Sequence, residues 1–112
     1  MNLHRIVGQR APAVIPPGWR HFDIYSGPAI VRDYSDGLRA LFSIDTLDDG
    51  KEWRHLSMSR QERYPGWDEM VVVIRECGLT DDKRDVVMVL PPKREHVNVM
   101  PNCFHWWQEV LS

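Results

Sequence analysis

Cysteine is scarce in this chain, and the motifs that commonly hold cofactors and metals are missing. The 112 residues include two cysteines, Cys77 and Cys103, which make at most one disulfide. Small secreted scaffolds rely on several disulfides, so we expect two reduced thiols in a cytoplasmic protein. The sequence has no C-x-x-C pair, no H-x-x-x-H pair and no glycine-rich phosphate loop. These absences favour a protein without a cofactor or a metal.

Long apolar runs are missing as well. The longest, Met70 to Ile74, is far too short to cross a bilayer. Residues 1–8 lack the apolar segment of a secretion signal. We therefore expect no membrane partner and a protein that works in the compartment where it is made.

Neither sign of charge dominates. Fourteen basic against sixteen acidic residues give a formal charge of -2, which argues against nucleic-acid binding through the overall field. A local basic patch stays compatible with this balance. Hydrophobic residues make up 43% of the chain, enough to exclude a disordered protein, and the length suits one domain.

The chain divides near residue 18. Four residues, Pro12, Pro16, Pro17 and Gly18, interrupt any regular period, so residues 1–18 are predicted to form an irregular N-terminal arm. Residues 19–112 are then a single α+β domain.

Strand patterns come first in that domain. Ile30-Val31 leads through the turn Ser35-Asp36-Gly37 into an alternating run from Leu38 to Ile44, which indicates a hairpin. A second turn at residues 48–50 precedes the alternating segment 53–59. The sequence thus predicts a meander of three antiparallel strands.

A helix and two more strands follow. Between Pro65 and Gly78 the apolar residues fall on one helix face. The continuous apolar run Val86 to Leu90 predicts a central strand covered on both sides, and Cys103 to Trp107 predicts a last short strand. The expected fold is α+β, a mainly antiparallel sheet in the order β-β-β-α-β-β with one helix packed on one face.

Several short motifs occur in a fixed order over the second half of the chain. They lie at residues 53–59 (WRHLSMS), 64–70 (YPGWDEM), 90–92 (LPP), 96–98 (HVN) and 103–107 (CFHWW). This order resembles a family of small phage and prophage proteins, a domain of unknown function whose pattern is W-x-H-V-S-V-S, P-x-W-E-E-M, P-P, V-N and C-x-H-x-W. Asp68 stands where that family usually has Glu, and Gly66 where it has a small polar residue. The resemblance implies a viral or prophage origin and no established catalytic residues.

Two arrangements suggest chemistry. His55, Ser57 and Ser59 share one face of a predicted strand, as a histidine base and a serine nucleophile would. The strand repeat of about 7 Å is too long for a His–Ser hydrogen bond, and no G-x-S-x-G turn is present. We therefore favour a sheet-face histidine held by polar neighbours, and an enzyme using His55, His96 or His105 is the weaker hypothesis.

The second arrangement would bind zinc. Cys103 and His105 share a strand face, and with Cys77, His55 or His96 they would supply four ligands. The alternative that we favour is buried cysteine acting as a small apolar residue.

Basic side chains gather in two predicted loops. Arg60 and Arg63 precede the helix beside Tyr64, while Lys93, Arg94 and His96 follow Pro91-Pro92. If the two loops meet, the guanidinium groups would clamp a phosphate and Tyr64 would stack on a base. This predicts the alternative function, a nucleotide- or nucleic-acid-binding module.

Tryptophan is abundant, with five residues in the chain. Trp106 and Trp107 are adjacent on a predicted strand and so point to opposite faces, one into the core and the other toward a partner. An open sheet edge adds a route to a homodimer.

The leading functional hypothesis is a phage-type accessory protein that binds a host or phage protein, or itself, stoichiometrically, and a binder of this kind fits the sequence better than an enzyme does. Inhibition of a host defence system is the use that the resemblance suggests, with the host cytoplasm as the site of action. The predicted binding residues are Arg60, Arg63, Tyr64, Lys93, Arg94, His96, His105 and Trp107. No catalytic, cofactor-binding or metal-binding residue is predicted.

Overall fold

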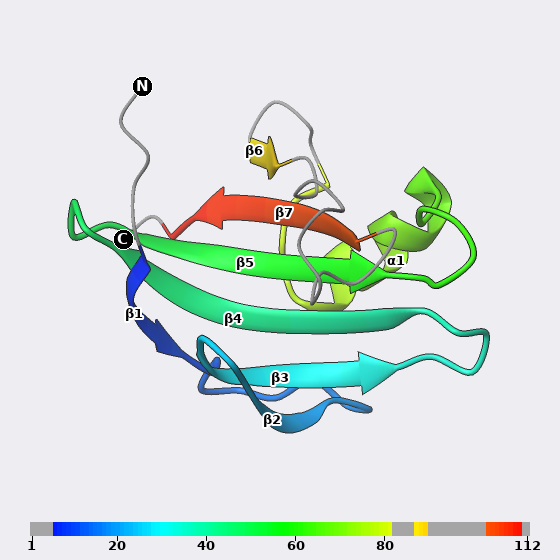
Figure 1. The fold of residues 1–112 in the computed structure, drawn as a ribbon, viewed down its shortest axis with the longest axis horizontal. Helices are drawn as coiled ribbons and strands as arrows, with labels where there is room; N and C mark the ends of the chain where they lie inside the picture. The colour runs from blue at the N-terminus through cyan, green and yellow to red at the C-terminus, as the bar shows by residue number, and fades with distance from the viewer. Residues whose placement is uncertain (1–5, 82–86, 90–102, 111–112) are drawn as a thin grey trace.

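A computed structural model describes residues 6–81, 87–89 and 103–110, with the side chains of 6–81 and 103–110 (Figure 1). Seven strands and one helix lie within these ranges. In chain order they are β1 (Ile6–Arg10), β2 (Arg20–Ile24), β3 (Gly27–Asp33), β4 (Arg39–Leu47), β5 (Glu52–Ser59), α1 (Trp67–Glu76), β6 (Val87–Val89) and β7 (Cys103–Glu109).

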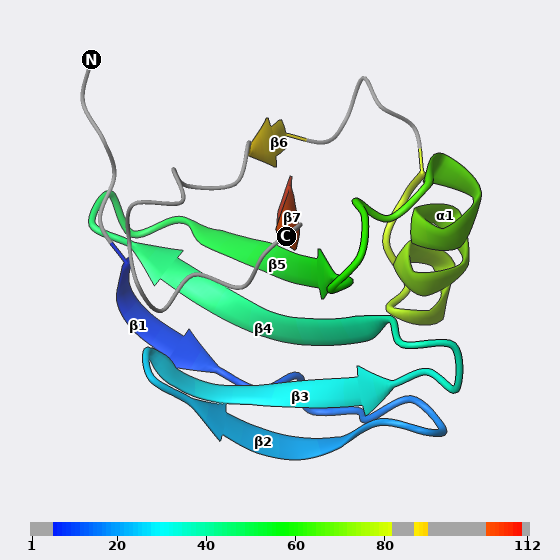
Figure 2. The same ribbon diagram turned by 45° about the vertical axis from the view of Figure 1, so that its right-hand side comes forward.

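The strands form one antiparallel sheet in the order β2-β3-β4-β5-β7-β6, and β1 pairs with β4 beside this path. The single helix α1 lies at one end of the sheet, beside the end of β5 (Figure 2). This arrangement confirms the α+β fold class with a mainly antiparallel sheet. No helix in the described ranges has the length and apolar character needed to cross a membrane.

Five strands, rather than the expected three, precede the helix. The additional strand β1 lies inside the segment predicted to be irregular, where Gly8 pairs with Thr46 and Arg10 with Ile44 of β4. Its five residues carry no clear local strand signal. They form a strand because their backbone groups pair with β4, about 35 residues further along the chain. The prolines that follow keep β1 short. β2 is the other strand that was missed, and it forms a hairpin with β3.

The apolar run over residues 86–90 was predicted to be a central strand, and this prediction is wrong. Its described part, β6, lies at the end of the strand order and, among the described strands, pairs with β7 alone. The place beside β5 belongs to β7, which pairs with β5 from Trp53↔Glu109 to Ser59↔Cys103. Strand order depends on this long-range pairing, so local apolarity alone could not decide it.

The hydrophobic core lies on one face of the sheet, where α1 packs. Alternating residues of the strands point into it, as the period of two requires. The fully buried members include Ile30, Ala40, Leu56, Met58, Val73, Ile74 and Trp106. The helix predicted between Pro65 and Gly78 is therefore confirmed in position, and its buried residues are Met70, Val73 and Ile74.

The C-terminal end of α1 is fixed to the rest of the domain through Glu76. Its carboxylate accepts hydrogen bonds from the hydroxyl of Tyr34 at 2.6 Å, from Nη1 of Arg32 at 3.0 Å and from the indole N–H of Trp19 at 3.2 Å. Gly78 then ends the helix in the left-handed conformation, with φ of +71°, which suits glycine. The helix, β3 and the segment before β2 are thereby joined at one point.

Candidate functional site

The sheet face opposite the core carries a partly buried polar network. Three neighbouring strands supply its side chains, two from each of β4, β5 and β7, and the register places them side by side. We call this group the histidine–cysteine network; its members are Ser43, Asp45, His55, Ser57, Cys103 and His105.

The network starts at a carboxylate that solvent does not reach. Asp45 is 0% exposed, and one of its oxygens accepts a hydrogen bond from Ser43 Oγ at 2.8 Å. The other oxygen lies 3.1 Å from Nδ1 of His55. A carboxylate only accepts hydrogen bonds, so Nδ1 of His55 carries a hydrogen. In the neutral form of the ring, Nε2 of His55 is then an acceptor.

The line continues from His55 to the thiol. Nε2 of His55 lies 2.8 Å from Nδ1 of His105, so His105 donates through Nδ1 and its own Nε2 carries the lone pair. That Nε2 faces Sγ of Cys103 at 3.6 Å. On its other side the sulfur lies 3.0 Å from Oγ of Ser57. A basic nitrogen therefore faces a thiol whose sulfur has a hydroxyl neighbour.

Burial keeps both ends of the thiol–imidazole contact neutral. Burial, aided by the nearby His55, lowers the pKa of His105 to about 4. Burial also raises the pKa of the Cys103 thiol, an effect that the Ser57 hydrogen bond opposes. At neutral pH the pair is a thiol beside a neutral imidazole, and not a thiolate–imidazolium ion pair.

The two adjacent tryptophans point to opposite faces, as predicted. Trp106 is 0% exposed in the core. Trp107 is half-buried on the other face, where its ring stacks on His55 with centroids 3.8 Å apart and planes 5° apart. One face of the Trp107 ring is thus covered within the chain, and its role as an interface residue stays a prediction.

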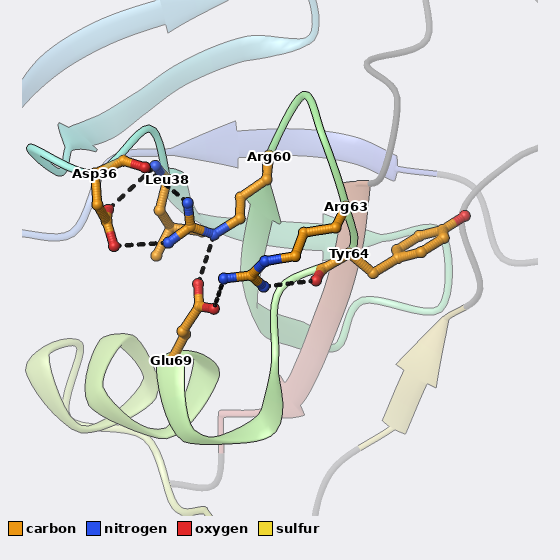
Figure 3. A network of polar contacts seen from close by, with 6 residues as sticks. All are labelled: Asp36, Leu38, Arg60, Arg63, Tyr64 and Glu69. Atoms are coloured by element: carbon orange, nitrogen blue, oxygen red, sulfur yellow. Dashed lines mark hydrogen bonds and ion pairs between the residues drawn. The ribbon is translucent and has the colours of Figure 1, made fainter.

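The basic residues before the helix are neutralised by carboxylates (Figure 3). Arg60 donates to Glu69 at 2.6 Å and to the side chain of Asp36 at 2.7 Å, and Arg63 donates to Glu69 as well. Burial raises the pKa of Glu69, but the hydrogen bonds from Arg63 and Arg60 outweigh this effect and lower it below its ordinary value. The ring of Tyr64 points away from both guanidinium groups (Figure 3). These arginines connect the loop to α1.

A pocket of about 520 Å³ lies beside these residues and has no excess of positive charge. Its charged lining is balanced, with Arg39, Arg60 and Arg63 against Asp33, Asp36 and Glu62. Arg39 donates to Asp33 at 2.6 Å, so each of the three guanidinium groups already has a carboxylate partner. A phosphate would have to compete with those carboxylates.

Two further predictions concern the second basic loop and the pair His55 and Ser57. Lys93, Arg94 and His96 lie outside the described residues, so the predicted meeting of the two basic loops stays a prediction. One ring nitrogen of His55 faces Asp45 and the other faces His105, while the hydroxyl of Ser57 contacts Cys103 and not His55. The expected absence of a His55–Ser57 hydrogen bond agrees with these contacts.

The zinc arrangement does not form among the side chains that the structure describes, where no group of three or more metal-ligating residues occurs. Cys103 and His55 lie at opposite nitrogens of His105, so the donor atoms follow a line and do not converge on one point. Cys77 packs against the core on the other face, and burial raises its pKa to about 12.

Exposed apolar side chains occur on two neighbouring segments, β1 and the turn between β2 and β3. Tyr25, in the turn between β2 and β3, is 109% exposed, and Val7 of β1 is 58% exposed. Gln9 of β1 donates a 3.0 Å hydrogen bond to the carbonyl of Pro28 in β3, so β1 and this turn lie side by side (Figure 1). We call Val7 and Tyr25, with Ile6, the apolar end.

The fold and the network define a small α+β domain built on one antiparallel sheet. A family model matches residues 45–110, and the chain belongs to that family, a domain of unknown function designated DUF7694. Searches of curated proteins and of solved structures each found no match to the chain. The matched segment includes Asp45, His55, Ser57, Cys103 and His105, and leaves out β1, β2 and β3.

Proposed function

We propose that the protein is a binding module that acts stoichiometrically on a protein partner. The apolar end carries this proposal, because an exposed tyrosine and exposed aliphatic residues stand on two neighbouring segments there. Exposed apolar groups of this kind often mark protein-binding surfaces, and tyrosine supplies a large contact area at little cost in side-chain entropy.

The anionic-ligand alternative has less support. The guanidinium groups of Arg39, Arg60 and Arg63 are each held by a carboxylate of the same chain. A nucleotide would gain attraction only by displacing those carboxylates, and their pairing also removes the long-range field that steers phosphates. The protein-binding surface is therefore the better-supported candidate.

The resemblance to phage and prophage proteins supports a bacterial setting. In this proposal a phage or prophage encodes the protein, which acts in the cytoplasm of the host cell on a host or phage protein. Inhibition of a host defence system is the use that we favour. A second copy of the chain is the other partner that the proposal admits, because β2 is the last strand on its side of the described sheet.

Replacing Tyr25 with alanine should weaken binding to the partner about 30-fold, roughly 2 kcal/mol, as for an aromatic residue central to an interface. The measurement is affinity recovery from nuclease-treated bacterial lysate, identification of the recovered protein, and titration of that purified protein against wild type and variant. Because Tyr25 is fully exposed, the variant should keep the wild-type unfolding midpoint.

Tyr64→Ala is the matched control, since Tyr64 is also exposed, at 46%, but lies in the loop before α1. It should bind like the wild type. Loss of binding in Tyr64→Ala alone, or recovery that nuclease abolishes, would reject the apolar end and favour the anionic ligand. Light scattering on the purified protein tests the homodimer directly.

A further inference from the structure

The histidine–cysteine network has the order of groups that cysteine nucleophiles need. The lone pair of His105 Nε2 faces the Cys103 thiol, and the hydrogen on His105 Nδ1 is directed at His55. Asp45 fixes the His55 ring in turn. With both imidazole rings neutral, each hydrogen bond in this line determines the direction of the next, and one arrangement of ring hydrogens satisfies the whole line.

We propose that Cys103 is a nucleophile toward small acyl compounds, the thioesters and activated esters, with His105 as its general base. His55 and Asp45 are positioning residues, because they act on the reaction through the orientation of His105. This site is independent of the apolar end, which lies on other strands, and either proposal can fail without the other.

The proposed reaction is an ordinary acyl transfer. Sγ of Cys103 attacks the acyl carbon while its proton passes to Nε2 of His105, and a carbon–sulfur bond forms. The bond from the acyl carbon to the departing oxygen or sulfur then breaks, and that atom takes the proton from His105. Water afterwards attacks the acyl-cysteine with His105 again as the base, which releases a carboxylic acid and restores the thiol.

The surroundings suit a base that acts during attack rather than a preformed ion pair. Among the side chains that the structure describes, the titratable groups that face His105 are His55 on β5 and Cys103 on its own strand, with Asp45 on β4 beyond His55. Ser57 is placed to donate to the sulfur as negative charge develops there. Neutral partners in a buried site avoid the cost of a standing ion pair.

The burial of the network also argues for a role beyond folding. The apolar core lies on the opposite face, so these six polar side chains add little to it. Buried polar groups cost free energy unless each of them is hydrogen-bonded, and apolar side chains would fill the same face without that cost. Cys103 is 7% exposed, so little of its surface is open to a reagent.

The test uses p-nitrophenyl acetate with the full-length protein, followed by peptide mapping of the acetyl group. In samples quenched with acid before hydrolysis is complete we expect up to one acetyl per chain, on Cys103 and not on Cys77, the internal control, whose thiol pKa is raised to about 12. His105→Gln should lower the acylation rate about 100-fold, the usual contribution of a general base. Asp45→Asn should lower it less and should change its pH profile, which a merely structural role would not do.

The wild-type pH profile is a second readout that needs no variant. With His105 as the base, the rate should be flat between pH 6 and 8, because that imidazole is already unprotonated there. A thiol that reacts without a base would instead speed up about tenfold per pH unit, with its thiolate fraction. Such a rise, no acetyl on Cys103, or an unchanged rate in folded His105→Gln would each overturn the proposal.

Discussion

Replacing Trp106 with alanine should lower the free energy of unfolding by about 3–5 kcal/mol, the usual cost of removing a buried aromatic side chain. Trp106 is 0% exposed, belongs to the core cluster and packs against Trp67 of α1 with ring centroids 5.4 Å apart. Its loss opens a cavity between β7 and the helix. Urea unfolding followed by circular dichroism measures the change.

Two further variants make this result specific. Trp107→Ala removes the same side chain from the other sheet face, where it is half-buried, and should cost clearly less. Trp106→Phe should also be mild, because the buried indole N–H of Trp106 has no hydrogen-bond partner among the described residues and phenylalanine removes that donor. A larger loss in Trp107→Ala than in Trp106→Ala would contradict the assignment of the core face.

Lowering the pH from about 6.5 to 4 should cost the protein on the order of 3 kcal/mol through His105 alone. Its pKa is lowered in the folded state to about 4 from the ordinary value of 6.5, a difference of 2.5 units. Between these values the unfolded chain binds a proton that the folded protein does not. Falling pH therefore favours unfolding across this window, and the loss is complete below pH 4.

The control for acid unfolding is His105→Gln, which has no proton to gain at this position. Its stability should vary little between pH 6.5 and 4.5. Three carboxyl groups, Asp33, Asp36 and Glu69, have pKa values lowered by their arginine partners, so their stabilisation is lost only as pH falls further. Equal acid sensitivity of wild type and variant from pH 6.5 to 4.5 would show that His105 titrates normally.

The sequence was informative wherever a pattern was local. The turn Ser35-Asp36-Gly37 located the hairpin of β3 and β4, and the apolar spacing before Gly78 located α1. The adjacency of Trp106 and Trp107 showed that one of them enters the core. These features depend on residues within a few positions of one another, which is where the period of a strand or helix is visible.

Features that depend on distant pairing were not visible. β1 is a strand because it pairs with β4, and β6 is the last strand on its side of the described sheet because β7 takes the place beside β5. The register between strands also determines which side chains form the histidine–cysteine network. The alternate positions of His55 and Ser57, and of Cys103 and His105, each showed a polar strand face, but only the pairing of β5 with β7 brings the two faces together.

Asp45 was missed as a member of the site for a related reason. It occurs near the end of an alternating strand, where an acidic residue reads as an exposed position before a turn. Its complete burial follows from its place on the covered face, beside Ser43 and within reach of His55. The signal available in the sequence was the spacing of two residues between Asp45 and Ser43, which places both side chains on the same face of a strand.

The most direct test of the histidine–cysteine network is nitrogen-15 NMR of the histidine rings between pH 5 and 8. The hydrogen bonds predict that His55 and His105 both carry their hydrogen on Nδ1 at neutral pH, and that His105 stays neutral down to about pH 5. A His105 ring with its hydrogen on Nε2, or one that gains a proton near pH 6.5, would contradict the network, because no lone pair would then face Cys103.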